Sequence, residues 1–199
     1  MNEAVEAFND MKWSNWDEKF MPYKDPTGVL KDTPRPSKKE IEKDKKLISV
    51  DTETSSINPI DADLVGISFC YEEGKACYIP LKNKDQKCLN PETVLKKIKP
   101  LLEDPSIKKI GQNMKYDYII FIKNKIEVNP IEDTMLTSYT LDAGLNRHNL
   151  DTLAEIHLGH KTISFKDLVG SGKKQITFSE VDLKKATEYA GEDADVTFR

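Results

Sequence analysis

Two acidic residues, Asp51 and Glu53, have the types and spacing that most clearly suggest chemistry. They follow a short apolar run at residues 47–50 that predicts a buried strand. In an extended backbone, side chains two residues apart point to the same side, about 6.6 Å from each other. Such carboxylates repel unless a cation neutralises them, and hard oxygen ligands suit Mg²⁺ or Mn²⁺. Taken alone, the pair leaves open that these are two solvated acids at the end of a strand.

A tyrosine and an aspartate near residue 190 form a second candidate pair. Tyr189 and Asp193 are four residues apart in a predicted helix, so they lie on one face, about 6 Å apart along the axis. Nonpolar residues predicted on nearly the same face are Leu183, Ala186 and Ala190. We therefore expect both side chains to point into the domain, where an aspartate needs a partner or a metal. That Tyr189 is ordinary core packing stays open.

An α/β domain with a mixed sheet is predicted to position these residues. Apolar runs predict strands over about 47–50, 64–71, 76–81 and 108–111. Helical periodicity predicts helices over about 91–104, 114–125, 131–142, 149–158 and 179–198. Asp117, a further candidate acid, falls one turn into the second of these helices, and Ser179-x-x-Asp182 predicts a capping box at the start of the last. Strands followed mostly by helices are typical of α/β domains.

The chain is predicted to have two parts, an arm or linker over 1–46 and the domain over 47–199. Residues 3–20 predict a short amphipathic helix. Prolines at 22, 26, 34 and 36 follow, and residues 37–46 are almost all charged, which indicates a solvated helix or a connector. Whether the arm is a linker remnant or a docked structural helix stays open.

Composition excludes several classes of protein. The chain has 199 residues, and its net charge of −4 does not favour electrostatic coating of nucleic acid, although a metal-bridged contact with phosphate stays open. No run of 18 apolar residues predicts a membrane span. Three cysteines without a C-x-x-C spacing favour a reducing, intracellular compartment. Glu3 and Glu6 stand where a leader peptide would be basic, so no targeting segment is predicted.

Three short motifs occur in the order found in a known enzyme family. They are Asp51-x-Glu53, Asn113-x-x-x-Asp117 and Tyr189-x-x-x-Asp193. Together they resemble the tyrosine class of the DEDD 3′–5′ exonucleases; the other subclass has a histidine where this chain has Glu188. The stretches 50–54, 62–69, 111–117, 147–154 and 189–197 resemble the proofreading domain of family A DNA polymerases, the polymerase I type. The resemblance implies a ribonuclease H-like fold, with helices flanking a mixed central sheet.

The resemblance also implies phosphodiester hydrolysis with two divalent ions, Mg²⁺ or Mn²⁺. Two such ions, about 3.5–4 Å apart, make a water nucleophilic and neutralise the charge on the phosphate and the leaving oxygen. By the resemblance, Asp51, Glu53 and Asp193 hold the first ion. Asp51 bridges to the second ion, which Asp117 reaches through coordinated water. Tyr189, with its hydroxyl protonated, orients the attacking water together with Glu53.

The implied substrate is a frayed single-stranded or mismatched 3′ end of DNA. Ile57 and Phe165 stand where the family wedges a side chain against the terminal bases, and such stacking tolerates any sequence. Residues that match positions near the strand and its phosphates are Gln112, Asn113, Lys115, Tyr116 and Arg147. For each of them, ordinary capping or packing stays an alternative. A polymerase domain is expected C-terminal to this domain in the full-length protein, and no membrane is expected as a partner.

Two other functions stay open beside an active proofreading exonuclease. One is a catalytically silent DNA-binding or spacer domain of a polymerase, and the other is an RNA 3′-trimming exonuclease of the same superfamily. The presence of all four acids and of the tyrosine favours activity. The lysine-rich sequence, with its asparagine and isoleucine, resembles plastid polymerases of apicomplexan parasites, which implies a plastid location after loss of a transit peptide.

Two weaker motifs do not support a site. The glycine-rich run at 170–174 lacks the spacing of a phosphate loop and follows no predicted strand. His157 and His160 have the spacing of a metal pair but lack further ligands for zinc. We therefore expect both histidines to lie at the surface.

Overall fold

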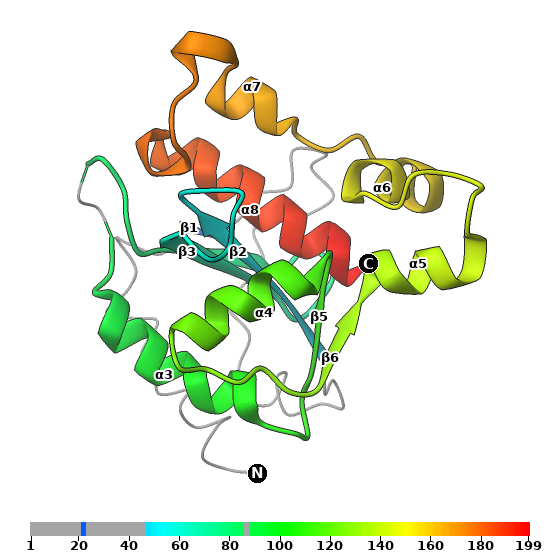
Figure 1. Cartoon of the computed structure of the whole chain (residues 1–199), viewed down its shortest axis with the longest axis horizontal. Coiled ribbons are helices and arrows are strands. Elements are labelled where there is room, and N and C mark those ends of the chain that lie inside the picture. Colours follow the sequence, from blue (N-terminus) through cyan, green and yellow to red (C-terminus); the bar gives the residue numbers. More distant parts are fainter. Residues whose placement is uncertain (1–20, 23–46, 86–87) are drawn as a thin grey trace.

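A mixed six-stranded sheet forms the centre of this computed structural model, which describes residues 21–22, 47–85 and 88–199 (Figure 1). The strands lie in the order β1 (Met21–Pro22), β4 (Ala76–Pro80), β3 (Leu64–Cys70), β2 (Leu47–Thr54), β5 (Lys108–Gly111) and β6 (Ile131–Asp133). Neighbours from β1 to β2 are antiparallel, whereas β2, β5 and β6 run parallel. The predicted mixed sheet is therefore confirmed. The helix predicted over 3–20 and the charged run at 37–46 lie outside the described residues.

Alternating side chains of β2 face two different layers of helices. Val50 packs in the larger core with Ile98 of α3 and Phe121 of α4. Ser49 points the other way, and its hydroxyl donates to the Ala194 carbonyl of α8 at 2.6 Å. The helices concerned are α3 (Pro91–Glu103), α4 (Met114–Lys123) and α8 (Leu183–Phe198). The sheet thus has α3 and α4 on one face and α8 on the other (Figure 1).

Small residues allow α8 to lie close to the sheet. Ala186, Ala190 and Ala194 are all buried. The first two belong to a second core that includes Tyr78 of β4, and Tyr189 packs against this core. The prediction that this face of the helix points into the domain is confirmed.

The helix predicted over 131–142 begins three residues late. Residues 131–133 form strand β6 because they pair with β5, and α5 (Thr134–Asp142) follows. The Asp133 side chain caps α5 by accepting hydrogen bonds from its first backbone N–H groups.

The helix predicted over 179–198 also begins late. Its first residues form the 3₁₀ turn η3 (Phe178–Glu180), and α8 starts only after Asp182. The predicted capping box Ser179-x-x-Asp182 is wrong, because Thr177 and Glu180 form the box of η3 and Asp182 caps α8.

The remaining elements lie between α5 and η3. They are α6 (Leu150–Leu158), α7 (Phe165–Val169) and the 3₁₀ turn η2 (Gly172–Lys174). Helix α7 was not predicted because five residues are too few to show a helical period. In Figure 1, α7 lies at the top of the view, and α5 and α6 lie together at its right side.

Candidate active site

Strand β2 presents Asp51 and Glu53 inside the sheet. It continues to Thr54, beyond the predicted end at residue 50, because β3 goes on pairing with it. Asp51 lies opposite Ser68, and Glu53 lies opposite Gly66. The two acids are therefore on one face of the strand, the face that also carries Ser49 and that α8 covers.

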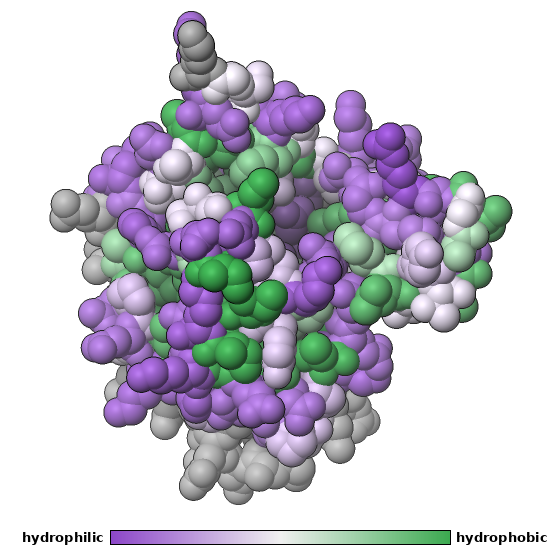
Figure 2. All heavy atoms as spheres, in the orientation of Figure 1, coloured by the Kyte–Doolittle hydropathy of each residue, from purple (hydrophilic) through white to green (hydrophobic). Residues whose placement is uncertain are grey.

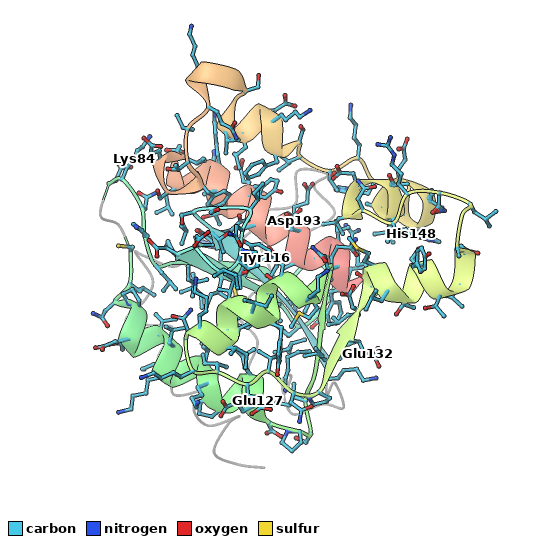
Figure 3. All side chains as sticks on the ribbon, viewed as in Figure 1. Lys84, Tyr116, Glu127, Glu132, His148 and Asp193 are labelled. Atoms are coloured by element: carbon cyan, nitrogen blue, oxygen red, sulfur yellow. The ribbon has the colours of Figure 1, made fainter. Side chains whose placement is uncertain are left out.

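Asp193 of α8 joins the two acids of β2 to form a group of three carboxylates. One carboxylate oxygen from each of Asp51, Glu53 and Asp193 lies within 4.8 Å of the other two. Glu53 is buried, and its Oε1 has no hydrogen-bond partner within the described part of the chain. The surface is hollowed over the middle of α8 (Figure 2), where Figure 3 labels Asp193. Converging acidic oxygens of this kind suit a cation.

A glycine and a tyrosine shape the wall beside Glu53. The Tyr78 ring occupies the space in which a side chain at Gly66 would stand, so only glycine fits opposite Glu53. Burial, together with the nearby Glu53 charge, raises the pKa of the Tyr78 hydroxyl. Tyr78 thus keeps its proton beside the carboxylates.

Asp117 of α4 is tied to the strand that carries the other acids. Its Oδ1 accepts a hydrogen bond from the Thr52 backbone N–H at 3.0 Å and another from the Thr52 hydroxyl at 2.5 Å. Asp117 itself lies outside the group of three whose oxygens are within 4.8 Å. Thr52, the middle residue of the D-x-E motif, escaped the sequence analysis; its hydroxyl between two acids was the available signal.

Tyr189 contributes both to the core and to the site, the two roles that the sequence left open for it. Its ring packs against the core under α8 and lies 5.8 Å from the Phe165 ring and 6.0 Å from the Phe178 ring. Burial raises the pKa of its hydroxyl, and the Asp193 carboxylate, one turn further along the helix, lies close enough to raise that pKa further. The ring of Tyr189 is therefore part of the core, and its hydroxyl is part of the candidate site.

Burial and the charges of nearby acids raise the pKa values of all four acids. Desolvation is the largest cause for Asp51 and Glu53, and the charges of neighbouring acids add to it. Burial also raises the pKa of Asp117 to about 7, although the hydrogen bonds from Thr52 partly lower it, and burial raises the pKa of Asp193 to about 8. Burial and Asp193 raise the pKa of the Tyr189 hydroxyl, which stays protonated. A bound cation would lower the pKa values of the carboxylates.

Asp133 is a positioning residue that the sequence analysis missed. Its carboxylate accepts hydrogen bonds from the backbone N–H groups of Asn113 at 3.1 Å and Met114 at 2.8 Å, where α4 begins. It also accepts from Met135 at 2.9 Å and Leu136 at 3.3 Å, where α5 begins. Asp133 thereby fixes the start of the helix that carries Asp117. Its place directly before a helical run was the signal for a cap.

The loop between β2 and β3 exposes Ile57, one of the two predicted wedges. The Ile57 side chain is 97% exposed. Lys123, at the end of α4, holds this loop because its Nζ donates to the carbonyls of Pro59 at 3.0 Å, Ile60 at 2.7 Å and Ala62 at 2.7 Å. Figure 2 shows apolar side chains on the face of the molecule where this loop and α4 lie in Figure 1.

Phe165, the second predicted wedge, begins helix α7. Its side chain is 43% exposed, and its ring stacks on Phe178 with a centroid distance of 6.5 Å and an interplanar angle of 2°. Because the same ring lies beside Tyr189, Phe165 borders the carboxylate group.

The two histidines of the rejected zinc motif lie in different surroundings. His157 is exposed, as predicted. The prediction that His160 lies at the surface is wrong: only 13% of its side chain is exposed, because Nε2 lies 2.8 Å from Oε1 of the buried Glu192. Among the described residues no third ligand joins the two histidines.

Tyr116, a predicted DNA contact, borders the carboxylates. Its hydroxyl hydrogen-bonds to the Thr54 hydroxyl at 2.5 Å and donates to the Ser56 carbonyl. Burial and the nearby acids raise the pKa of this hydroxyl. Figure 3 shows Tyr116 next to the Asp193 label in the middle of the view.

The other predicted DNA contacts lie near the start of α4 and before α6. Gln112 Nε2 donates to the His148 carbonyl at 2.7 Å, which joins these two regions. Asn113 has a φ of 60°, the left-handed conformation, and stands at the N-cap position of α4 without a capping hydrogen bond from its side chain. Lys115 and Arg147 are exposed.

Solved structures with a similar arrangement define the fold. Brucella melitensis NrnC matches with a TM-score of 0.59 and 21% identity over 78% of this chain and 70% of that chain. Escherichia coli RNase D, described as an exoribonuclease involved in structured RNA processing, matches with a TM-score of 0.57 and 17% identity over 77% of this chain and 37% of that chain. The predicted ribonuclease H-like exonuclease fold is therefore confirmed.

The sequence comparison places the chain more closely. The profile of a 3′–5′ exonuclease family matches residues 33–199, so the chain belongs to this family, as the motifs predict. DNA polymerase I of Pseudomonas aeruginosa is 45% identical over 159 residues, and that of Rhizobium leguminosarum is 41% identical over 173 residues. Each match covers 77% of this chain but 17% of the relative, so the chain spans less than a fifth of the length of these polymerases.

The relatives and the helices bear on where the protein is located. The named polymerase relatives are bacterial and do not support the expected plastid location. No helix in the described part of the chain is long and apolar enough to cross a membrane.

Proposed function

We propose that this domain hydrolyses the terminal phosphodiester bond at 3′ ends of DNA, releases nucleoside monophosphates and so proofreads newly made strands. The observation that carries the proposal is the convergence of Asp51, Glu53 and Asp193 oxygens within 4.8 Å of one another. Membership of the 3′–5′ exonuclease family supports the same reaction.

Two Mg²⁺ or Mn²⁺ ions are the proposed cofactors. The residues fit such ions because the donors are hard carboxylate oxygens and Glu53 Oε1 is buried with no partner among the described residues. Asp51, Glu53 and Asp193 would hold one ion, and Asp51 with Asp117 the other. When bound, such ions activate a water and stabilise the charge on the phosphate and the leaving oxygen.

The chain's own groups orient the attacking water and the acids. The Tyr189 hydroxyl keeps its proton because burial and Asp193 raise its pKa, so it donates a hydrogen bond to the water while Glu53 accepts one. Thr52 acts one step away, because its two hydrogen bonds to Asp117 hold that carboxylate in place.

Two exposed apolar side chains suit the unpaired terminal bases of a DNA strand. Ile57, in the loop between β2 and β3, and Phe165, at the start of α7, are both exposed. Stacking of a base on an aromatic ring contributes about 1–3 kcal/mol with little sequence preference. A matched end must first unpair, at a cost of a few kcal/mol, whereas a mismatched end is already frayed. Further proposed contacts to the strand are Gln112, Asn113, Lys115, Tyr116 and Arg147.

A polymerase domain in the same protein is the proposed partner. The curated relatives are DNA polymerases, and the chain matches less than a fifth of their length. A silent spacer domain is disfavoured because the chain keeps all four acids and Tyr189.

The test is hydrolysis of a 5′-labelled single-stranded DNA oligonucleotide in Mg²⁺ and in EDTA, with an RNA oligonucleotide of the same sequence in parallel. We expect DNA products that shorten from the 3′ end in Mg²⁺ and no products in EDTA. Faster hydrolysis of RNA would support 3′ trimming of RNA instead. No hydrolysis of either strand in Mg²⁺ or Mn²⁺ would contradict the proposal and favour a silent domain.

A further inference from the structure

Glu192 is a buried acid on α8 that the proposed reaction does not use. Its side chain is 1% exposed, and both carboxylate oxygens have partners. Oε1 lies 2.8 Å from His160 Nε2, and Oε2 accepts a hydrogen bond from the Ile163 backbone N–H at 2.6 Å. Both partners lie in the segment that joins α6 to α7. Because a buried carboxylate is costly to leave unpaired, these bonds fix that segment to α8.

The fixed segment leads directly to Phe165. Phe165 follows Ile163 by two residues, and its ring lies 5.8 Å from the Tyr189 ring. The other side of the segment is tied to α6, because the Thr162 hydroxyl donates to Asp151 at 2.6 Å. Glu192 thus links the position of Phe165 to the helix that carries Tyr189 and Asp193.

We infer that Glu192 and His160 are positioning residues that set Phe165 against the terminal base of the DNA strand. Neither residue belongs to the group of three carboxylates, so they act through Phe165, and the inference rests on the proposed function. Loss of the pair should therefore raise the KM for single-stranded DNA, while kcat and the affinity for Mn²⁺ stay close to those of the wild type.

The first arm of the test compares two acids of the same helix. Glu192→Gln keeps the shape of the side chain but removes its charge, and we expect the KM to rise about 10-fold with kcat within about threefold. Asp195→Asn is the matched control, because Asp195 is also buried on α8 but has different partners. It accepts a hydrogen bond from the Gly74 N–H, in the turn after β3, at 2.5 Å, and it pairs with Arg199, at the end of α8, at 3.2 Å. The control should change the KM by less than about twofold. An equal rise in both variants would overturn the inference.

The second arm asks whether Glu192 acts through Phe165. In a Phe165→Ala protein, Glu192→Gln should raise the KM by less than about twofold more, because the side chain that it positions is gone. Effects that multiply would overturn the inference. Hydrogen exchange of the Ile163 amide should be faster in Glu192→Gln than in the wild type, and unchanged exchange would also overturn it.

Two further outcomes are separable. If Glu192→Gln does not fold, His160→Ala serves in its place, because it removes only one of the two contacts of Glu192 and leaves the hydrogen bond to Ile163. His160→Ala should still raise the KM. An unchanged KM in this variant would overturn the inference. A wild-type protein that protects the Ile163 amide yet cleaves no DNA would defeat the proposed function, and the inference with it.

Discussion

The carboxylate group and the two segments beside it are built in opposite ways. The acids project from regular elements, β2, α4 and α8, and their positions follow from backbone geometry. Ile57 and Phe165 lie at exposed positions next to irregular segments, which Lys123 and Glu192 hold through hydrogen bonds to the backbone. The difference indicates that hydrolysis depends on carboxylate oxygens at fixed positions. Substrate affinity depends instead on the hydrogen bonds of Lys123 and Glu192, which position the two exposed side chains. Mutations should therefore affect turnover and substrate affinity independently.

Removing both acids of β2 gives the largest expected effect. Asp51→Asn with Glu53→Gln should slow hydrolysis of single-stranded DNA by at least about 10³-fold, because ligands are lost while the shape is kept. In EDTA the variant should melt no lower than the wild type, since carboxylate repulsion is relieved. Gel-based rates and thermal melting measure the two effects. A variant that kept more than a few per cent of the wild-type rate would rule out this group as the site.

Tyr189→Phe separates the ring from the hydroxyl. We expect hydrolysis to slow by about 10–10³-fold, because the water loses a positioning contact. Affinity for single-stranded DNA in Ca²⁺, measured by fluorescence anisotropy, should stay unchanged since the ring remains. Normal turnover would assign Tyr189 to the core alone.

Phe165→Ala tests the flanking side of the comparison. The KM for single-stranded DNA should rise about 5- to 160-fold, as expected for the loss of about 1–3 kcal/mol of stacking, and kcat should change little. Ile131→Ala is a matched control because Ile131, on edge strand β6, is 42% exposed against 43% for Phe165. A fall in kcat with an unchanged KM would show that the two regions are not separate.

The pH dependence of stability tests the buried acids without any substrate. In EDTA the melting temperature should fall by several °C as the pH rises from about 4 to about 8. The folded pKa values, about 7 for Asp117 and about 8 for Asp193, lie above the ordinary value of 3.8, so the folded state binds more protons in this range and deprotonation destabilises it. Mg²⁺ should raise the melting temperature more at pH 8 than at pH 5. A melting temperature that rises over this range would contradict these shifts.

Lys123→Met gives the smallest expected effect. The change removes three hydrogen bonds from an exposed lysine to the loop that carries Ile57, each worth about 0.5–1.5 kcal/mol at most in net terms. We expect the KM to rise about two- to threefold, measured beside Lys96→Met, which removes an exposed charge from α3. Equal KM values for the two variants would show that the loop keeps its conformation without the three hydrogen bonds of Lys123.

The sequence predicts the acids well because their spacing is a local property. Residues two apart on a strand and four apart on a helix face the same way wherever the element lies, so Asp51 could be paired with Glu53, and Tyr189 with Asp193, in advance. It was the resemblance to the exonuclease family that joined the two pairs into one site.

The cap that Asp133 provides to α5 is local in the same way, but its contact with the start of α4 and the contact of Glu192 with His160 are not. These partners lie 20 and 32 residues away, and only the folded arrangement of separate segments brings them together. The late start of α5 has the same cause, since pairing with β5 overrides helical periodicity.

The hydrogen bond from Ser49 to the Ala194 carbonyl fixes the rotation of α8 as well as its distance from β2. Each residue of an α-helix advances the rotation by about 100°. A shift of one residue would therefore turn Tyr189, Glu192 and Asp193 away from their partners at the same moment. A helix displaced by one residue would lose its part of the carboxylate group and its contact with the segment before α7 together.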